Sequence, residues 1–183
     1  KGFITVKYND KEFDITAGNL STCHLGKILG TKSNEFKFEV GHIFKDDKRA
    51  LVIIDRKHIK DKDGSNRKKY KYYCNKCHFK GDNHYSSRDE TFKNEHWIDE
   101  RELTSGHGCG CCCGWIVVNG INDISTTAPE LVKYFKNTKE SKRYVKTSGR
   151  KIQAKCPDCG KEKDIQVSQL YRQGLGCQYC GDG

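Results

Sequence analysis

The sequence predicts a small zinc-stabilised α+β fold. Tandem four-cysteine zinc ribbons, with short β-hairpins and short helices, are expected to follow an N-terminal β element. Eleven cysteines in 183 residues include two CxxC pairs near the C-terminus, Cys156/Cys159 and Cys177/Cys180, a spacing typical of a four-thiolate zinc site. A similar set lies upstream. Only 34% of the residues are hydrophobic and the net charge is +10, so metal ligation is expected to supply folding energy that a large core would otherwise provide.

An internal repeat identifies the ligands of the upstream set. Residues 106–109 and 174–177 share the pattern Gly-x-Gly-Cys, and this alignment places Cys109 on Cys177 and Cys112 on Cys180. We therefore expect two structural Zn²⁺ ions, the first bound by Cys74, Cys77, Cys109 and Cys112 and the second by Cys156, Cys159, Cys177 and Cys180. Alternative ligands for the first site are Cys111, Cys113, His78, His84, His96 and His107.

The use of cysteine favours metal ligation over disulfides, because the cysteines occur as CxxC pairs in a lysine-rich chain without a signal peptide. We expect a reducing, intracellular setting, the cytoplasm of a bacterial host. No run of eighteen apolar residues occurs, so no membrane association is expected. Cys23 has no other cysteine near it in the sequence and is expected to be a buried small apolar residue.

Three parts are expected along the chain: an N-terminal β-hairpin element at 1–44, the first zinc-ribbon module at 45–118 and the second at 119–183. In the first part, alternating apolar residues at 3–8 and 12–15 flank a turn at 9–10. In the first module, residues 51–54, 70–74 and 115–118 have the apolar runs of strands, and the strand at 70–74 leads into the first CxxC pair.

The first module contains an acidic insert at residues 82–103, with seven acidic residues against three basic ones. Its apolar pattern predicts a short amphipathic helix that begins after Ser86 or Ser87 and packs on the ribbon through Trp97. The alternative is a protein-contact element, because phosphates would repel an acidic face.

The second module is predicted to open with a capping helix at 128–136. Thr127 and Glu130 have the spacing of a capping box, and Pro129 lies near the first helical position. Asn137 is the expected C-cap. The side chains expected to face the second ribbon are Leu131, Val132 and Phe135.

Positive charge is concentrated beside the CxxC pairs. Residues 45–80 hold thirteen Lys and Arg against five acids, and residues 133–163 hold eleven against three. Tyrosines lie among these charges, a combination typical of nucleic-acid surfaces, although a solvated lysine-rich face is the alternative. The predicted phosphate contacts are Arg67, Lys68, Lys69, Lys71, Arg143, Lys146, Arg150 and Lys151. The predicted base readers are Arg150, Gln153, Gln169 and Arg172.

Residues 119–183 resemble the zinc-ribbon, treble-clef-like DNA-binding region of phage homing-endonuclease-like proteins of Gram-positive bacteria. The resemblance rests on the segments 120–131 and 134–135, the lysine- and tyrosine-rich stretch that follows, the knuckle segment 155–160, and the C-terminal residues Leu170, Gly174, Cys177 and 180–183. It is weaker over 40–118. It implies binding of double-stranded DNA by the targeting part of an endonuclease whose nuclease domain would follow Gly183.

The expected function is therefore DNA binding, with no catalytic residues and no small-molecule substrate. The carboxylates are scattered along the chain or lie in the acidic insert, which does not suit a two-metal nuclease centre. One alternative is a phage protein-interaction module that binds or inhibits a host nucleoprotein through residues 82–103. Another is a nuclease site of His84, Asn94 and His96, whose spacing is short for a His-Asn-His motif.

Overall fold

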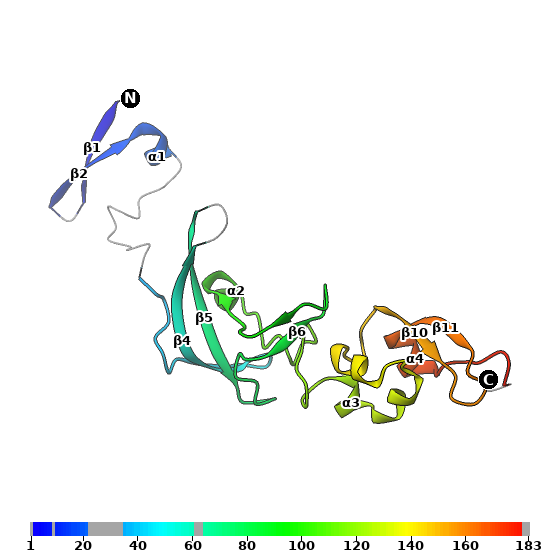
Figure 1. Cartoon of the computed structure of the whole chain (residues 1–183). Helices are drawn as coiled ribbons and strands as arrows, with labels where there is room; N and C mark the ends of the chain where they lie inside the picture. Colours follow the sequence, from blue (N-terminus) through cyan, green and yellow to red (C-terminus); the bar gives the residue numbers. More distant parts are fainter. Residues whose placement is uncertain (1, 9, 22–34, 61–63, 181–183) are drawn as a thin grey trace. The chain divides into compact units, whose positions relative to one another are not determined.

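The computed structural model describes residues 2–8, 10–21, 35–60 and 64–180 (Figure 1). The chain divides into two compact units, Lys1–Lys37 and Phe38–Gly183. Cys23, predicted to be buried, and Asn9 of the predicted turn lie outside the described residues. Among the described residues, none of the helices has the length and apolar character needed to cross a bilayer.

The N-terminal unit contains the predicted hairpin. Strands β1 (Phe3–Tyr8) and β2 (Lys11–Thr16) pair antiparallel and are followed by a short helix, α1 (Ala17–Ser21), which the sequence pattern did not predict. This unit ends earlier than the expected boundary at residue 44. The reason is that β3 (Ile43–Lys45) pairs with the first long strand of the second unit.

The first ribbon module is built on an antiparallel sheet of order β3-β4-β5-β8, in which β4 (Ala50–Lys60) and β5 (Asn66–Cys74) form a long hairpin. Side chains alternate between the two faces of a strand, and the inner face of this hairpin carries fully buried Leu51 and Tyr72. Helix α2 (Glu100–Thr104) lies against β5 (Figure 1).

The acidic insert does not form the helix that was predicted after Ser86 or Ser87. It forms β6 (His84–Ser86), β7 (Phe92–Lys93) and β8 (Ile98–Asp99), and only α2 at its end is helical. Two causes are visible. Tyr85 and Phe92 are cross-strand partners with ring centroids 5.2 Å apart, and Asp89 accepts hydrogen bonds from the Thr91 backbone and hydroxyl, which favours a turn. β6 also pairs with β9 (Ile116–Val117), far along the chain.

The second ribbon module opens with three short helical turns instead of one capping helix. They are α3 (Ile124–Thr127) and two 3₁₀ helices, η1 (Pro129–Tyr134) and η2 (Thr138–Arg143). The hairpin β10 (Lys151–Lys155) and β11 (Glu162–Gln166) then leads directly into α4 (Val167–Gln173), and the three lie together in Figure 1.

The predicted capping box at Thr127 is wrong. Asp123 caps α3 instead: its carboxylate accepts hydrogen bonds from the backbone and hydroxyl groups of Thr126, and the Thr127 hydroxyl donates to the Asp123 carbonyl. Asn137, predicted as a C-cap, begins η2 by accepting from the Lys139 N–H. Because Asp123 is the N-cap, the helical segment begins earlier than the predicted cap at Thr127 would have placed it.

The predicted packing of this segment is nevertheless confirmed. Leu131 and Phe135 are buried in the core of the second module, and Val132 is partly buried against it. The same core contains Ile152 from β10 and Leu170 from α4. The prediction of one continuous helix was wrong, but the spacing of the apolar residues still identified the side chains that face the core.

Within the described residues, an antiparallel strand pair followed by a helix occurs three times with the same spacing. Residues 4 and 15, 70 and 98, and 152 and 165 are cross-strand partners, and in each case a helix begins two residues after the second partner. A leucine follows five residues after that partner: Leu20, Leu103 or Leu170. In the N-terminal copy, Tyr8 pairs with Lys11, so a two-residue connection replaces the CxxC knuckle.

We predict that Leu103→Ala and Leu170→Ala each lower the free energy of unfolding of their own module by about 2–5 kcal/mol, because both side chains are 0% exposed and truncation leaves a cavity. Leu20→Ala is the matched control and should cost much less, since Leu20 is 36% exposed. Hydrogen exchange measured by mass spectrometry resolves each module. Equal losses of protection in all three variants would contradict the assigned burial.

Candidate metal centres and charged surfaces

The two CxxC knuckles have the same backbone geometry. The N–H of the first cysteine, Cys74 or Cys156, donates to the carbonyl group five residues later, at 2.9 and 2.8 Å. The residue before that carbonyl, His78 or Gly160, has a positive φ of 61° or 72°. This turn directs both sulfur atoms of a knuckle to the same side, and the second pair of cysteines approaches after α2 or α4.

The structure brings together the eight cysteines that the repeat predicted, as two groups of four. Within each group all sulfur atoms lie within 4.8 Å of one another. The closest pairs are Cys74–Cys112 at 3.7 Å, Cys77–Cys109 at 3.6 Å, Cys156–Cys180 at 3.7 Å and Cys159–Cys177 at 3.5 Å. Sulfurs placed tetrahedrally about 2.3 Å from a metal are about 3.8 Å apart, whereas a disulfide is about 2.05 Å long. Each group can therefore hold a metal ion.

The electrostatics of these groups suit a bound cation. Burial and the neighbouring thiol of Cys77 raise the pKa of Cys109 to about 12, and burial and Cys109 raise the pKa of Cys112. In the other group, the Tyr179 backbone N–H lowers the pKa of Cys177 to about 7. Four thiolates so close together repel one another, so a divalent ion between them is needed for all four to ionise.

The alternative ligands of the first site lie outside the group of four. Cys111 is buried at 2% exposure and Cys113 is exposed, but neither belongs to the group. His78 pairs its Nδ1 with the Tyr73 hydroxyl at 2.6 Å, and His107 pairs its Nδ1 with a backbone carbonyl at 3.1 Å. Coordination geometry thus favours the set predicted from the repeat.

His84 and His96 belong to the aromatic core of the first module. Their ring centroids are 5.2 Å apart at 90°, and both rings pack near Phe79. His84 is only 2% exposed, and burial lowers the pKa of both histidines, that of His96 to about 4. Their packing is that of neutral core side chains, whereas Asn94 is exposed.

Lysines of β4 and β5 form ion pairs with the acidic insert. Of the predicted phosphate contacts, Lys68 lies 3.1 Å from Glu100, Lys69 lies 2.9 Å from Asp99 and Lys71 lies 2.9 Å from Asp82. Lys57 is likewise 3.3 Å from Glu95, and its ammonium group lies 3.9 Å from the centre of the Trp97 ring. Trp97 thus contacts the ribbon as predicted, but from an extended segment.

The seven acids of the insert all contact groups of the same chain. Besides those paired with lysines, Asp89 contacts Thr91, Glu90 accepts from the Tyr144 hydroxyl at 3.0 Å, and Glu102 accepts from the Asp99 N–H. The pairing of the basic block with the acidic insert was not predicted. The signal was available, since the two charged segments lie next to each other in the chain.

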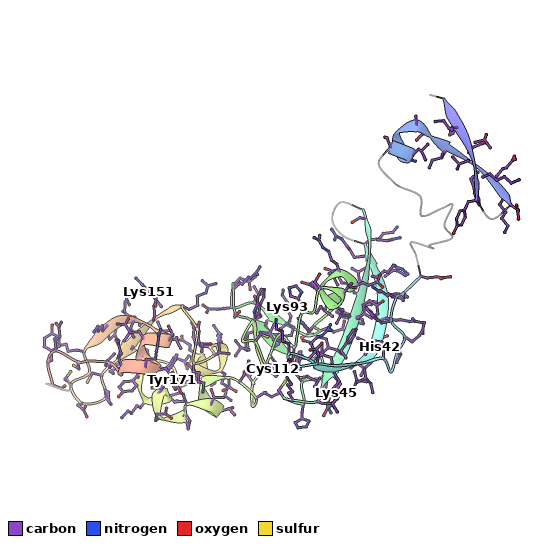
Figure 2. The ribbon with its side chains drawn as sticks, turned by 180° about the vertical axis from the view of Figure 1, so that it is seen from behind. His42, Lys45, Lys93, Cys112, Lys151 and Tyr171 are labelled. Carbon is purple, nitrogen blue, oxygen red and sulfur yellow. The ribbon has the colours of Figure 1, made fainter. Side chains whose placement is uncertain are left out.

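The cations of the second module are arranged differently. Arg143 and Lys151 are exposed, and Lys146 lies 5.1 Å from the centre of the Tyr171 ring. Within the part of the chain that the structure describes, no carboxylate forms an ion pair with these three side chains, while Arg150 is 4.0 Å from Glu90. Figure 2 shows Lys151 and Tyr171 on this module.

The predicted base readers are also exposed. Gln153 shares the outer face of β10 with Lys151, because side chains two residues apart point to the same face. On α4, Gln169 contacts Gln173 at 3.4 Å and the Arg172 Nε donates to the Ser168 carbonyl at 3.1 Å. Gln153 thus lies on the hairpin, whereas Gln169 and Arg172 lie on the helix.

The chain matches no protein-family model, and neither a curated protein nor a solved structure matches it. The resemblance to phage homing-endonuclease-like proteins therefore stays a prediction.

We predict that the full chain binds two metal ions, one for each group of four cysteines. Cys112→Ser and Cys180→Ser should each lower the content to one ion per chain, because a thiolate ligand is lost. The matched control is Cys113→Ser, which changes the residue next to Cys112 and should keep two ions. Elemental analysis of the purified proteins measures this. Loss of an ion in Cys113→Ser but not in Cys112→Ser would move the first site to the neighbouring cysteine.

Proposed function

We propose that both cysteine groups bind structural zinc and that the chain is a DNA-binding tandem zinc-ribbon protein, the targeting part of a phage homing-type endonuclease. Zinc prefers four thiolates in a tetrahedral arrangement, and four protein ligands leave no open coordination position for catalysis. The observation that supports DNA binding concerns the predicted phosphate contacts. Lys68, Lys69 and Lys71 of the first module are paired with carboxylates, whereas Arg143 and Lys151 of the second module are exposed.

Phosphate binding is assigned mainly to the second module. Arg143, Lys146 and Lys151 can accept phosphates as counterions without first giving up a carboxylate. Aromatic side chains accompany these cations: the Lys146 ammonium group packs over Tyr171, and that of Lys133 lies 5.1 Å from the centre of the Tyr134 ring. Such a mixed surface suits a sugar-phosphate backbone.

The first module contributes less to phosphate binding than its sequence suggests. Lys68, Lys69 and Lys71 would have to exchange an intramolecular carboxylate for a phosphate, and these side chains are only 17–19% exposed. The exchange of one anion for another gains little net electrostatic energy. We therefore assign this module a mainly structural role, with Arg67 at its exposed end.

Sequence reading is assigned to the outer face of β10 and to α4. Gln153 can donate to and accept from a base edge, and so can Gln169. Arg172 is the guanidinium group suited to guanine. Phosphate contacts from the neighbouring lysines would fix the register of these readers on the duplex.

The wider context follows from the resemblance of residues 119–183. In that setting the chain acts in the reducing cytoplasm of a bacterial host, and a nuclease domain supplies the cleavage. The rival protein-interaction function is less well supported, because the acids of the insert that suggested a partner surface contact lysines, hydroxyls and backbone N–H groups of their own chain.

We expect binding of the full chain to duplex DNA to weaken steeply with salt. Each phosphate contact contributes about −0.9 to the slope of log K against log salt concentration, so several contacts give a slope of several units. Fluorescence anisotropy of a labelled duplex at a series of KCl concentrations measures the slope. A flat dependence would remove the electrostatic basis of the proposed function.

The second module should account for most of that slope. Replacement of Arg143, Lys146 and Lys151 together by Gln should reduce its magnitude by roughly 2.7 if each contacts one phosphate. The matched control replaces Lys45, Lys48 and Lys60, three exposed lysines of the first module, by Gln and removes the same charge. Equal reductions in the two variants would indicate a non-specific charge effect and contradict the assignment.

A further inference from the structure

A cavity of about 460 Å³ lies where the acidic insert and the end of the first module meet the second module. Its wall includes Ser87 and Arg88 from the insert, Trp115 from the connection after the cysteine cluster, and Thr147, Ser148 and Arg150 from the approach to β10. Sites for small ligands have volumes of about 300–1,000 Å³, so the cavity can hold a group of the size of one nucleotide.

Trp115 is held in place by its backbone while its ring stays exposed. The Ser87 hydroxyl and N–H both donate to the Trp115 carbonyl, at 2.6 and 3.1 Å, and the Trp115 N–H donates to the Gly110 carbonyl at 2.9 Å. The side chain is nevertheless 57% exposed. A rigid backbone that holds an exposed indole ring in a cavity provides a preformed surface for a planar ligand.

The charge of the cavity is positive. Among the described residues that line it, the groups with a fixed charge are the guanidinium groups of Arg88 and Arg150, and none is a carboxylate. The Arg88 guanidinium carbon lies 5.2 Å from the centre of the Trp115 ring, while Arg150 is 4.0 Å from Glu90 outside the lining. The Ser148 and Thr147 hydroxyls add neutral hydrogen-bonding groups. This combination selects a ligand that is both planar and anionic.

We propose that this cavity binds one unpaired nucleotide of the DNA, with its base stacked on Trp115 and its phosphate between Arg88 and Arg150. The inference rests on the proposed function and makes it more specific. Aromatic side chains gain stacking energy with any base, and guanidinium groups pair well with phosphate. A paired base inside a duplex cannot reach the ring, so the preferred substrate is a duplex that contains an unstacked nucleotide.

The test uses the full chain and two duplexes that differ only by one bulged nucleotide. The bulged duplex should bind roughly 5- to 150-fold more tightly than the fully paired one, as expected for the stacking of one base. Trp115→Ala should remove this difference and leave binding to the paired duplex unchanged. The matched control is Tyr179→Ala, which truncates another exposed aromatic ring, 73% exposed, and should keep the preference.

Fluorescence gives a second, independent readout. The chain has two tryptophans, so Trp97→Phe leaves Trp115 as the only indole reporter. The bulged duplex should quench its emission through stacking, while Trp115→Phe, which keeps Trp97, should show no quenching. Equal affinity for both duplexes without quenching would overturn this inference and leave the proposed function standing. Failure to bind either duplex would overturn both.

Discussion

Each of the two modules brings four sulfur atoms within 4.8 Å of one another, and the repulsion between them as thiolates favours a cation at their centre. This constraint connects the parts of the module. In the second module, Cys156 and Cys159 follow β10, while Cys177 and Cys180 follow α4, so an ion held by all four would join the hairpin to the segment after the helix. The core beneath contains Phe135 and Leu170, and metal ligation would add to the stability that their burial provides.

The N-terminal unit shows the same hairpin and helix without this closure. Its helix α1 is five residues long against seven in α4, and Leu20 is 36% exposed where Leu170 is fully buried. A two-stranded hairpin is marginally stable by itself, and Phe3 at its edge is 70% exposed. The comparison within one chain shows that the hairpin register followed by a helix also occurs where no CxxC knuckle is present.

The sequence was most informative where coordination geometry dictates spacing. The Gly-x-Gly-Cys alignment identified the eight ligands because four sulfurs must reach one point, which limits the possible sets. It was least informative in the insert, where the pairing of Tyr85 with Val117 over a long separation overrode a local helical pattern. The third copy was overlooked because it lacks cysteines, although the run Glu-x-Asp-Ile at 12–15 and 162–165 was a signal for it.

The acidic insert gives the two basic blocks different roles. By pairing with lysines of β4 and β5, its carboxylates offset part of the positive charge of the first module, whereas Arg143, Lys146 and Lys151 of the second have no carboxylate in an ion pair among the described residues. The insert also contacts the second module, since Glu90 accepts a hydrogen bond from the Tyr144 hydroxyl. Burial of Tyr144, together with this hydrogen bond, raises the pKa of its hydroxyl to about 12. The contact between Glu90 and Tyr144 thus keeps the Glu90 carboxylate beside Arg150. Arg88, two residues before Glu90, lines the cavity together with Trp115. An insertion that reduces the charge of one module therefore also helps to build the cationic site at its boundary with the next.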